Sequence, residues 1–284
     1  MRFVITGAAG MLGQDVAAAA KGAGHDVVTL TRGELDIVDR AAAEATLRDA
    51  RPDVVVNCAA WTNVDGAESS PADALSVNGT GAGNVARAAA AAGAWTVHVS
   101  TDYVFDGTKR EPYVESDPIG PVSEYGRSKL AGEHEVADSA PGRHTTVRSS
   151  WLFGAGGPCF PATIIRLAGE RDELKVVDDQ IGCPTFTGHL AQALVELAAR
   201  ESPPVGVLHV AGGGTCSWYE FAREIVAAAG VSCEVQTCST AEMPRLATRP
   251  AYSVLRSERD APELPDWRRG LAQYMALTRA VSAI

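Results

Sequence analysis

Residues 3–13 read FVITGAAGMLG, an apolar run followed by glycines at every third position. The apolar run is typical of a buried strand, and the Ala-rich segment 14–21 that follows favours a helix. Gly7 suits a tight turn, Gly10 lets backbone amides come close to a ligand, and Gly13 lets the helix pack on the strand. Because a helix N-terminus also adds positive potential, the stretch predicts a turn that binds a dinucleotide pyrophosphate.

Short apolar runs continue to alternate with helical segments along the first half of the chain. Strands are expected at residues 26–30, 54–57, 96–100 and 145–148, each rich in Val, Ile or Thr. Ala-rich helices are expected between them, at residues 41–49 and 74–92. This alternation predicts an α/β fold with a Rossmann-type doubly wound parallel sheet, and we assign it to residues 1–157.

The pattern changes at the Gly/Pro-rich segment GAGGPCFP, residues 154–161. Residues 158–284 are expected to form a smaller C-terminal lobe that binds substrate. Within it, residues 188–215 supply a helix and a strand that are expected to return to the main sheet. Ser217 and Glu220 have capping-box spacing at a helix start, and residues 264–281 predict a terminal helix packed on the surface.

Composition excludes several classes of partner. The 284 residues carry a net charge of −10, which opposes general attraction to nucleic acid or anionic lipid. No apolar run approaches the roughly 20 residues of a membrane span, so we expect a cytoplasmic protein. The six cysteines are scattered without C-x-x-C or ligand-spaced His partners, which favours free thiols over a metal site or disulfides.

The stretch SEYGRSKLAGE, residues 123–133, places a phenol and an ammonium four residues apart, which is about one helical turn. Tyr125 and Lys129 would share a helix face, and a nearby ammonium lowers the pKa of a phenol. Such a phenol can protonate a carbonyl that receives hydride. Thr101, at the end of the strand VHVST, can hydrogen-bond the reacting oxygen. A chance Tyr/Lys pair and ordinary capping by strand-end hydroxyls stay open at this point.

The end of the second strand indicates which cofactor binds. Residues 29–32, TLTR, offer Arg32 and no acid, which favours the 2′-phosphate of NADPH over the ribose of NADH. NADH stays open, since a surface arginine without a ligand is the alternative. Asp36 and Ile37 are expected beside the adenine, and Ala59 and Ala60 after the third strand leave room for the cofactor.

Several stretches resemble the extended short-chain dehydrogenase/reductase superfamily, and most closely the dTDP-4-dehydrorhamnose reductase family. They are TGAAGMLG, NCAAWTNVD, VSTDYVFDG, YGRSKLAGE, VRSSWLFG, DDQIGCPT and LPDW, which span nearly the whole chain. The resemblance implies that Thr101, Tyr125 and Lys129 are catalytic, with Lys129 also binding the nicotinamide ribose. It places the cofactor at Gly10, Met11, Leu12, Asp36, Ile37, Ala59, Ala60 and Trp61. It places the substrate at Thr101, Asp102 and Trp151, and it gives Asn78 a supporting role.

The resemblance implies NADPH-dependent reduction of the C4 ketone of a dTDP-4-keto-6-deoxyhexose, dTDP-4-dehydro-β-L-rhamnose giving dTDP-L-rhamnose. Tyr103 follows Thr101-Asp102 where related dehydratases carry glutamate, which favours reduction over elimination. A sister reductase that makes another deoxysugar, such as dTDP-dihydrostreptose or an antibiotic sugar, stays open. So does a non-catalytic NADP-binding subunit, like the one that regulates methionine adenosyltransferase.

Two further expectations concern the second lobe and metal binding. Arg249 is expected to contact the substrate diphosphate, with a surface salt bridge as the alternative, and Trp218 is expected to pack its helix. Some family members use Mg²⁺ at a homodimer contact built from glutamates. Only Asp15 matches one of those positions here, so both Mg²⁺ and the homodimer stay open, and no metal ligand is assigned.

Overall fold

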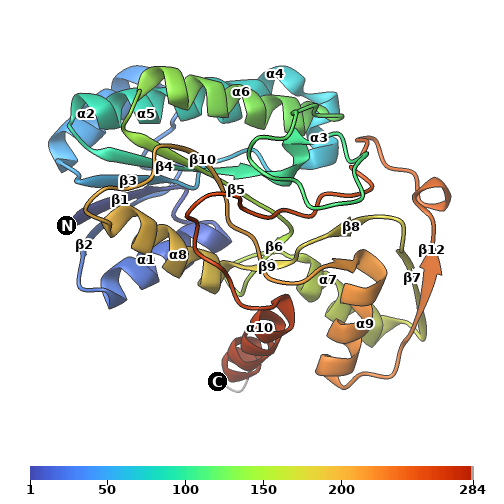
Figure 1. The fold of residues 1–284 in the computed structure, drawn as a ribbon. Coiled ribbons are helices and arrows are strands. Elements are labelled where there is room, and N and C mark those ends of the chain that lie inside the picture. Colours follow the sequence, from blue (N-terminus) through green and yellow to red (C-terminus); the bar gives the residue numbers. More distant parts are fainter. Residues whose placement is uncertain (283–284) are drawn as a thin grey trace.

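Six parallel strands form one sheet at the centre of the molecule, in the order β10-β5-β4-β3-β1-β2 (Figure 1). The structure is a computed structural model that describes residues 1–282, with side chains as far as residue 279. The strands are β1 (Arg2–Thr6), β2 (Asp26–Leu30), β3 (Val54–Asn57), β4 (Trp95–Thr101), β5 (His144–Ser149) and β10 (Gly206–His209). The chain reverses its direction of progress across the sheet at β1, between β2 and β3, and ligands bind at such switch points.

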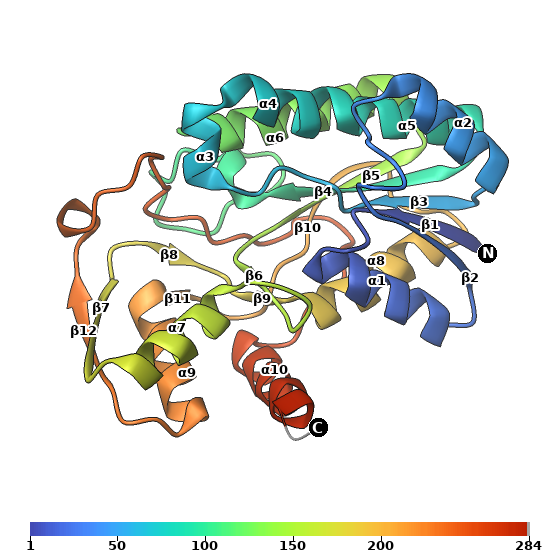
Figure 2. The same cartoon turned by 180° about the vertical axis from the view of Figure 1, so that it is seen from behind.

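Helices cover both faces of this sheet, which confirms the predicted doubly wound fold (Figure 2). Successive strand residues point to opposite faces, so Phe3 and Ile5 pack under one helical layer and Val4 under the other. One layer holds α1 (Met11–Gly22) and α8 (Thr187–Ala199), and the other α2 (Arg40–Ala50), α5 (Ala82–Ala91) and α6 (Glu124–Ser139). Every helix within residues 1–282 falls short of the length and apolarity needed to cross a bilayer.

A second, aromatic core lies below the carboxyl ends of the strands (Figure 1). Phe153, Phe221 and Trp267 are fully buried there. Its helices are α7 (Phe160–Glu170), α9 (Trp218–Ala229) and α10 (Trp267–Ser282). Its short strands are β6 (Leu152–Phe153), β7 (Glu173–Val177), β8 (Ile181–Gly182), β9 (Thr185–Phe186), β11 (Cys216–Ser217) and β12 (Glu234–Cys238).

Two local predictions for the C-terminal part are confirmed. The capping box forms at the start of α9, where Ser217 Oγ accepts from Glu220 N at 3.0 Å and Glu220 Oε2 accepts from Ser217 N at 2.9 Å. The terminal helix α10 packs Leu271, Tyr274 and Met275 against the second core. The boundary at residue 157 stays a prediction, although α8 does pack on α1 and β10 on β5.

The segment expected as one helix at residues 74–92 is instead interrupted. After α3 (Val64–Ser69) and α4 (Pro71–Leu75), residues Ser76–Gly81 form a π-helical turn that leads into α5. Such a turn widens the helix by one residue and often marks a functional position. The spacing of apolar residues does not distinguish it from a regular helix, so the sequence pattern missed it. Asn78, buried at its centre, is turned toward α6 and the loop after β3.

Candidate active site

At the glycine turn, the backbone after β1 lies in close contact with the backbone after β3. Gly7 has a φ of +66°, and a Cβ on it would lie 2.5 Å from Ala59 N. A Cβ on Gly13 would lie 2.5 Å from Gly7 O. Gly10 caps α1 without a side-chain hydrogen bond, so the amides of the first turn stay available to an anion.

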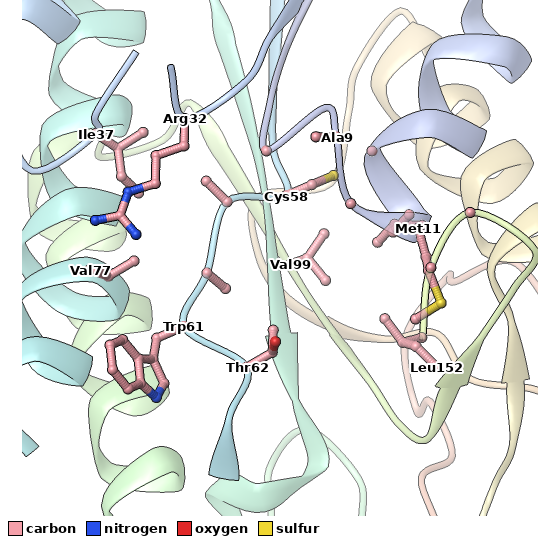
Figure 3. Close-up of a pocket in the computed structure, with 18 of the residues that line it drawn as sticks. Ala9, Met11, Arg32, Ile37, Cys58, Trp61, Thr62, Val77, Val99 and Leu152 are labelled. Carbon is pink, nitrogen blue, oxygen red and sulfur yellow. The ribbon is translucent and has the colours of Figure 1, made fainter. Parts of the chain in front are cut away.

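A cavity of about 500 Å³ opens above this turn (Figure 3). Arg32, Ile37 and Trp61 lie on one side of it, and Met11 on the other. Every residue predicted to bind the cofactor lines this cavity: Gly7, Gly10, Met11, Leu12, Gly13, Arg32, Asp36, Ile37, Ala59, Ala60, Trp61, Tyr125 and Lys129. The structure therefore brings together residues from four separate segments of the chain.

One wall of the cavity was missed by sequence reasoning. Residues 156–158 of the loop after β6 line it, and Gln14 Nε2 fixes that loop by donating to Gly156 O at 2.9 Å and to Ala9 O at 2.8 Å. A Cβ on Gly157 would lie 3.0 Å from Met11 Cγ. The Gly-Gly-Pro run indicated only a break between lobes, although such a run also allows a loop to approach a ligand closely.

The arginine expected to recognise a 2′-phosphate is exposed at the cavity rim. The neighbouring acid, Glu34, is held in its own turn, where its Oε2 accepts from Thr31 N and Thr31 Oγ1, both at 2.8 Å. These two hydrogen bonds lower the pKa of Glu34. Arg32 lines the cavity and Glu34 does not, but Asp36 lines it as well, so a ligand at this end meets one cation and one anion.

Tyr125 and Lys129 both reach the cavity from the first turns of α6. Ser123 caps this helix, with its Oγ accepting from Gly126 N at 3.1 Å. Lys129 is 2% exposed, and its Nζ donates to Val99 O at 2.7 Å. Burial lowers the pKa of Lys129 to about 8, against the opposing attraction of Glu133.

The expected effect of Lys129 on the phenol is wrong for this structure. Burial raises the pKa of Tyr125 to about 12, a hydrogen bond with Thr101 lowers it, and the charge of Asp102 raises it. The influences on this pKa are burial, Thr101 and Asp102, and the ammonium of Lys129 donates to the Val99 carbonyl. Desolvation outweighs the attraction that the spacing of the two residues suggested.

Thr101 and Asp102 lie side by side where β4 ends. Thr101 Oγ1 donates to Asp102 Oδ1 at 3.0 Å and accepts from Tyr103 N at 3.2 Å. Asp102 is 2% exposed, and burial raises the pKa of its carboxyl to about 7, against hydrogen bonds from Ser253 and Thr101 that lower it. The hydroxyl of Thr101, the phenol of Tyr125 and a readily protonated carboxyl thus meet at one point.

Asn78 links this catalytic helix to the cavity wall. Its Oδ1 accepts from Trp61 N at 2.8 Å, and its Nδ2 donates to Trp61 O at 3.0 Å and to Ser128 Oγ at 2.9 Å. Ser128 in turn donates to Tyr125 O at 2.8 Å. One amide therefore sets the spacing between the loop that carries Trp61 and the helix that carries Tyr125 and Lys129.

The residues predicted to bind substrate do not line the main cavity: Thr101, Asp102, Trp151 and Arg249. Trp151, at a φ of +48°, stacks on Trp218 with ring centroids 3.6 Å apart and planes 5° apart. Arg249 forms a two-bond ion pair with Asp65 at 3.1 and 3.0 Å, and it lines a second cavity of about 180 Å³. The salt bridge considered as the alternative for Arg249 is thus present, although it is partly buried rather than on the surface.

Metal ligands do not gather in the part of the chain that the structure describes. No group of three or more His, Cys, Asp or Glu side chains within residues 1–282 is arranged to hold an ion. Burial raises the pKa of Asp15, against an influence of Thr187 that lowers it.

A glycine turn at the switch point of a parallel sheet, with Tyr and Lys one turn apart over the same cavity, defines a protein of the short-chain dehydrogenase/reductase type. The family model described as "RmlD substrate binding domain" matches residues 1–280. The chain belongs to the dTDP-4-dehydrorhamnose reductase family, which confirms the resemblance seen in the sequence motifs.

Individual relatives match along almost the whole chain. A dTDP-4-dehydrorhamnose reductase of Mycolicibacterium smegmatis is 44% identical over 282 residues, covering 97% of this chain and 85% of that protein. A dTDP-4-keto-6-deoxy-D-glucose reductase of Streptomyces niveus is 41% identical over 284 residues and 98% of both chains. The crystal structure of dTDP-4-dehydrorhamnose reductase from Bacillus anthracis in complex with NADP is 36% identical, with a TM-score of 0.93 over 97% of this chain and 99% of that one.

Proposed function

We propose that the protein is an NADPH-dependent oxidoreductase that reduces the C4 ketone of a dTDP-4-keto-6-deoxyhexose. The substrate we favour is dTDP-4-dehydro-β-L-rhamnose, and the product is dTDP-L-rhamnose. One observation carries the proposal: Tyr125, one turn from Lys129, lines the same cavity as the glycine turn. The names of the relatives from M. smegmatis and B. anthracis support the substrate class.

The residues around the cavity fit an NADP cofactor. The turn at Gly7 and Gly10 leaves room and free amides for a pyrophosphate, and Arg32 supplies positive charge at the far end while Glu34 is bound to its own turn. The NADP bound to the B. anthracis relative supports the same choice. NADPH supplies the hydride when it is bound.

The residues of the chain would then handle the proton. Tyr125 stays protonated at neutral pH, as a proton donor must, and it passes its proton to the C4 oxygen as the alkoxide develops. Thr101 would turn its hydroxyl proton from Asp102 Oδ1 to the same oxygen, and Lys129 would hold the cofactor ribose. The positive charge of Lys129 would also favour the phenolate left on Tyr125 once the cofactor and substrate exclude water from the site.

A second reading is a sister 4-ketoreductase, and the name of the S. niveus relative supports it. The two proposed enzymes would use the same cavity and the same proton donor, and they would differ in the sugar that they accept. A non-catalytic NADP-binding subunit is less well supported, because the pair formed by Thr101 and Tyr125 has no evident purpose without a reaction.

Three further parts of the proposal concern the setting of the enzyme. We place it in the cytoplasm, because its six cysteines are all free, as is usual in a reducing compartment. We divide it into a cofactor domain, residues 1–157 with 188–215, and a sugar-nucleotide lobe in the rest of 158–284. A homodimer and the use of Mg²⁺ are left to measurement, by sedimentation and by assay with EDTA.

The test is an assay of purified protein with NADPH and dTDP-4-dehydrorhamnose. Oxidation of NADPH with formation of dTDP-rhamnose is expected, and Tyr125→Phe should lower kcat by roughly 10²- to 10⁴-fold while leaving NADPH binding intact. Oxidation with a different dTDP-4-ketosugar alone would favour the sister reductase. Cofactor binding without turnover on any ketosugar would overturn an enzymatic role.

A further inference from the structure

A buried carboxylate lies directly behind the site, on the same face of α6 as Lys129. Glu133 follows Lys129 by one helical turn, and its side chain is 5% exposed. Its Oε1 accepts from Ser100 Oγ at 2.5 Å and from Arg148 Nε at 2.9 Å, and its Oε2 accepts from Arg148 Nη2 at 2.7 Å. Both carboxylate oxygens are therefore engaged, and three elements, α6, β4 and β5, meet at this one group.

The contact with Ser100 connects this carboxylate to the reacting groups. Ser100 lines the main cavity and stands between Val99, whose carbonyl accepts from Lys129, and Thr101, which influences the pKa of Tyr125. By holding the Ser100 hydroxyl, Glu133 fixes the end of β4 against α6. The distance from Thr101 to the helix that carries Tyr125 depends on this tie.

Glu133 also differs in charge from every other titratable group that faces Lys129. Burial lowers the pKa of Lys129, and the attraction of Glu133 is the largest influence that raises it. Cys58, from the end of β3, has a thiol pKa raised to about 12 by burial, and His98, from β4, has a pKa lowered well below its usual value by burial. Tyr125 is also neutral at pH 7. Among the groups facing Lys129 in residues 1–282, Glu133 alone is then an anion.

We propose that Glu133 is a positioning residue for the reductase reaction, which keeps Lys129 charged in its buried position and fixes the end of β4 through Ser100. A buried ion pair such as Glu133–Arg148 adds little net stability compared with apolar side chains, so stability alone does not account for it. The inference rests on the proposed role of Lys129 in holding the cofactor ribose.

The test is the pH dependence of NADPH binding, measured by fluorescence in a Tyr125→Phe background so that the phenol cannot titrate. Affinity should fall on the alkaline side as Lys129 loses its proton. Adding Glu133→Gln should move the midpoint of this fall to lower pH by about one unit, because an anion has been removed beside a buried ammonium. Glu135→Gln removes the same charge from an exposed position two residues further on and should leave the midpoint unchanged.

Two additional variants keep the outcome clear. Lys129→Met should abolish the alkaline fall; if the fall persists, Lys129 does not hold the cofactor and that part of the proposed function is wrong. If Lys129→Met abolishes it and Glu133→Gln leaves the midpoint in place, only the inference about Glu133 is overturned. Should Glu133→Gln fail to fold by circular dichroism, Glu133→Gln with Arg148→Gln is compared with Arg148→Gln alone, because these two proteins differ only by the anion.

Discussion

Asn78 donates a hydrogen bond of 2.9 Å to Ser128 across the gap between the π-helical turn and α6. The same amide bonds both backbone groups of Trp61, on the wall of the main cavity. The wide π turn is what allows one side chain to reach both partners. A single residue thus couples the position of Trp61 on the cavity wall to the position of α6.

Asn78→Ala should impair both stability and catalysis. It removes three hydrogen bonds and leaves the Trp61 backbone groups without a partner, while Ser128 keeps only its bond to Tyr125 O. The cost is about 1–3 kcal/mol in the free energy of unfolding. We expect a lower midpoint in urea, a lower kcat and weaker NADPH binding. Ser128→Ala removes only the link to α6 and should preserve NADPH affinity. Equal effects of the two variants on NADPH affinity would contradict a role for Asn78 in holding Trp61.

Arg32→Ala should weaken NADPH binding and spare NADH. The loss of a charge-assisted contact to the 2′-phosphate costs about 1.5–3 kcal/mol, or roughly ten- to a hundredfold in Kd. Titration of each nucleotide by fluorescence measures the effect. Arg40→Ala is the control, because Arg40 pairs with Glu44 on α2 and does not line the cavity. A parallel loss for NADH would show that Arg32 does not read the phosphate.

The sequence predicted the fold and the glycine turn for a clear physical reason. Strand and helix periodicity depends on local apolar spacing, and the glycine turn is a local backbone requirement, so both are visible in short segments. The stack of Trp151 on Trp218 and the ion pair of Arg249 with Asp65 join residues 67 and 184 positions apart. No local pattern encodes such pairs. The raised pKa of Tyr125 likewise follows from burial, which spacing along a helix does not reveal.

Trp218→Ala should loosen the substrate site without affecting the cofactor. Trp151 is held at a positive φ, and its ring is stacked between Trp218 and Gly182. Losing an aromatic partner costs about 1 kcal/mol in addition to the loss of buried apolar surface. KM for the sugar nucleotide should therefore rise several-fold, while Kd for NADPH stays constant. Tyr219→Ala, on the same helix, is the control. An unchanged KM in Trp218→Ala would mean that Trp151 does not meet the substrate.

Arg249→Gln and Asp65→Asn separate two roles for the ion pair. Both variants break the same contact, so their melting temperatures should fall by similar amounts. If Arg249 also meets the substrate diphosphate, its loss should raise KM about tenfold more than the loss of Asp65. Equal KM values for the two variants would mean that the ion pair only joins the two lobes and does not contact the substrate.

Asp102→Asn should stabilise the protein, and more so at alkaline pH. The folded pKa of this buried carboxyl, about 7, is above its ordinary value of 3.8. The contribution of this carboxyl to the free energy of unfolding is therefore fully present below pH 3.8. It is lost as the pH rises through 7 and the buried carboxyl ionises. At pH 8 the wild type carries a buried charge that asparagine avoids, a difference of as much as about 4 kcal/mol in the free energy of unfolding.

Urea denaturation at pH 5 and pH 8 checks this prediction for Asp102. The gain from Asp102→Asn should be larger at pH 8 than at pH 5, whereas Asp138→Asn, at an exposed position of α6, should show no such difference. Equal gains at both pH values would mean that the folded carboxyl titrates normally. A carboxyl that costs stability at working pH is expected where it serves the reaction, so Asp102→Asn should also raise KM for the sugar nucleotide.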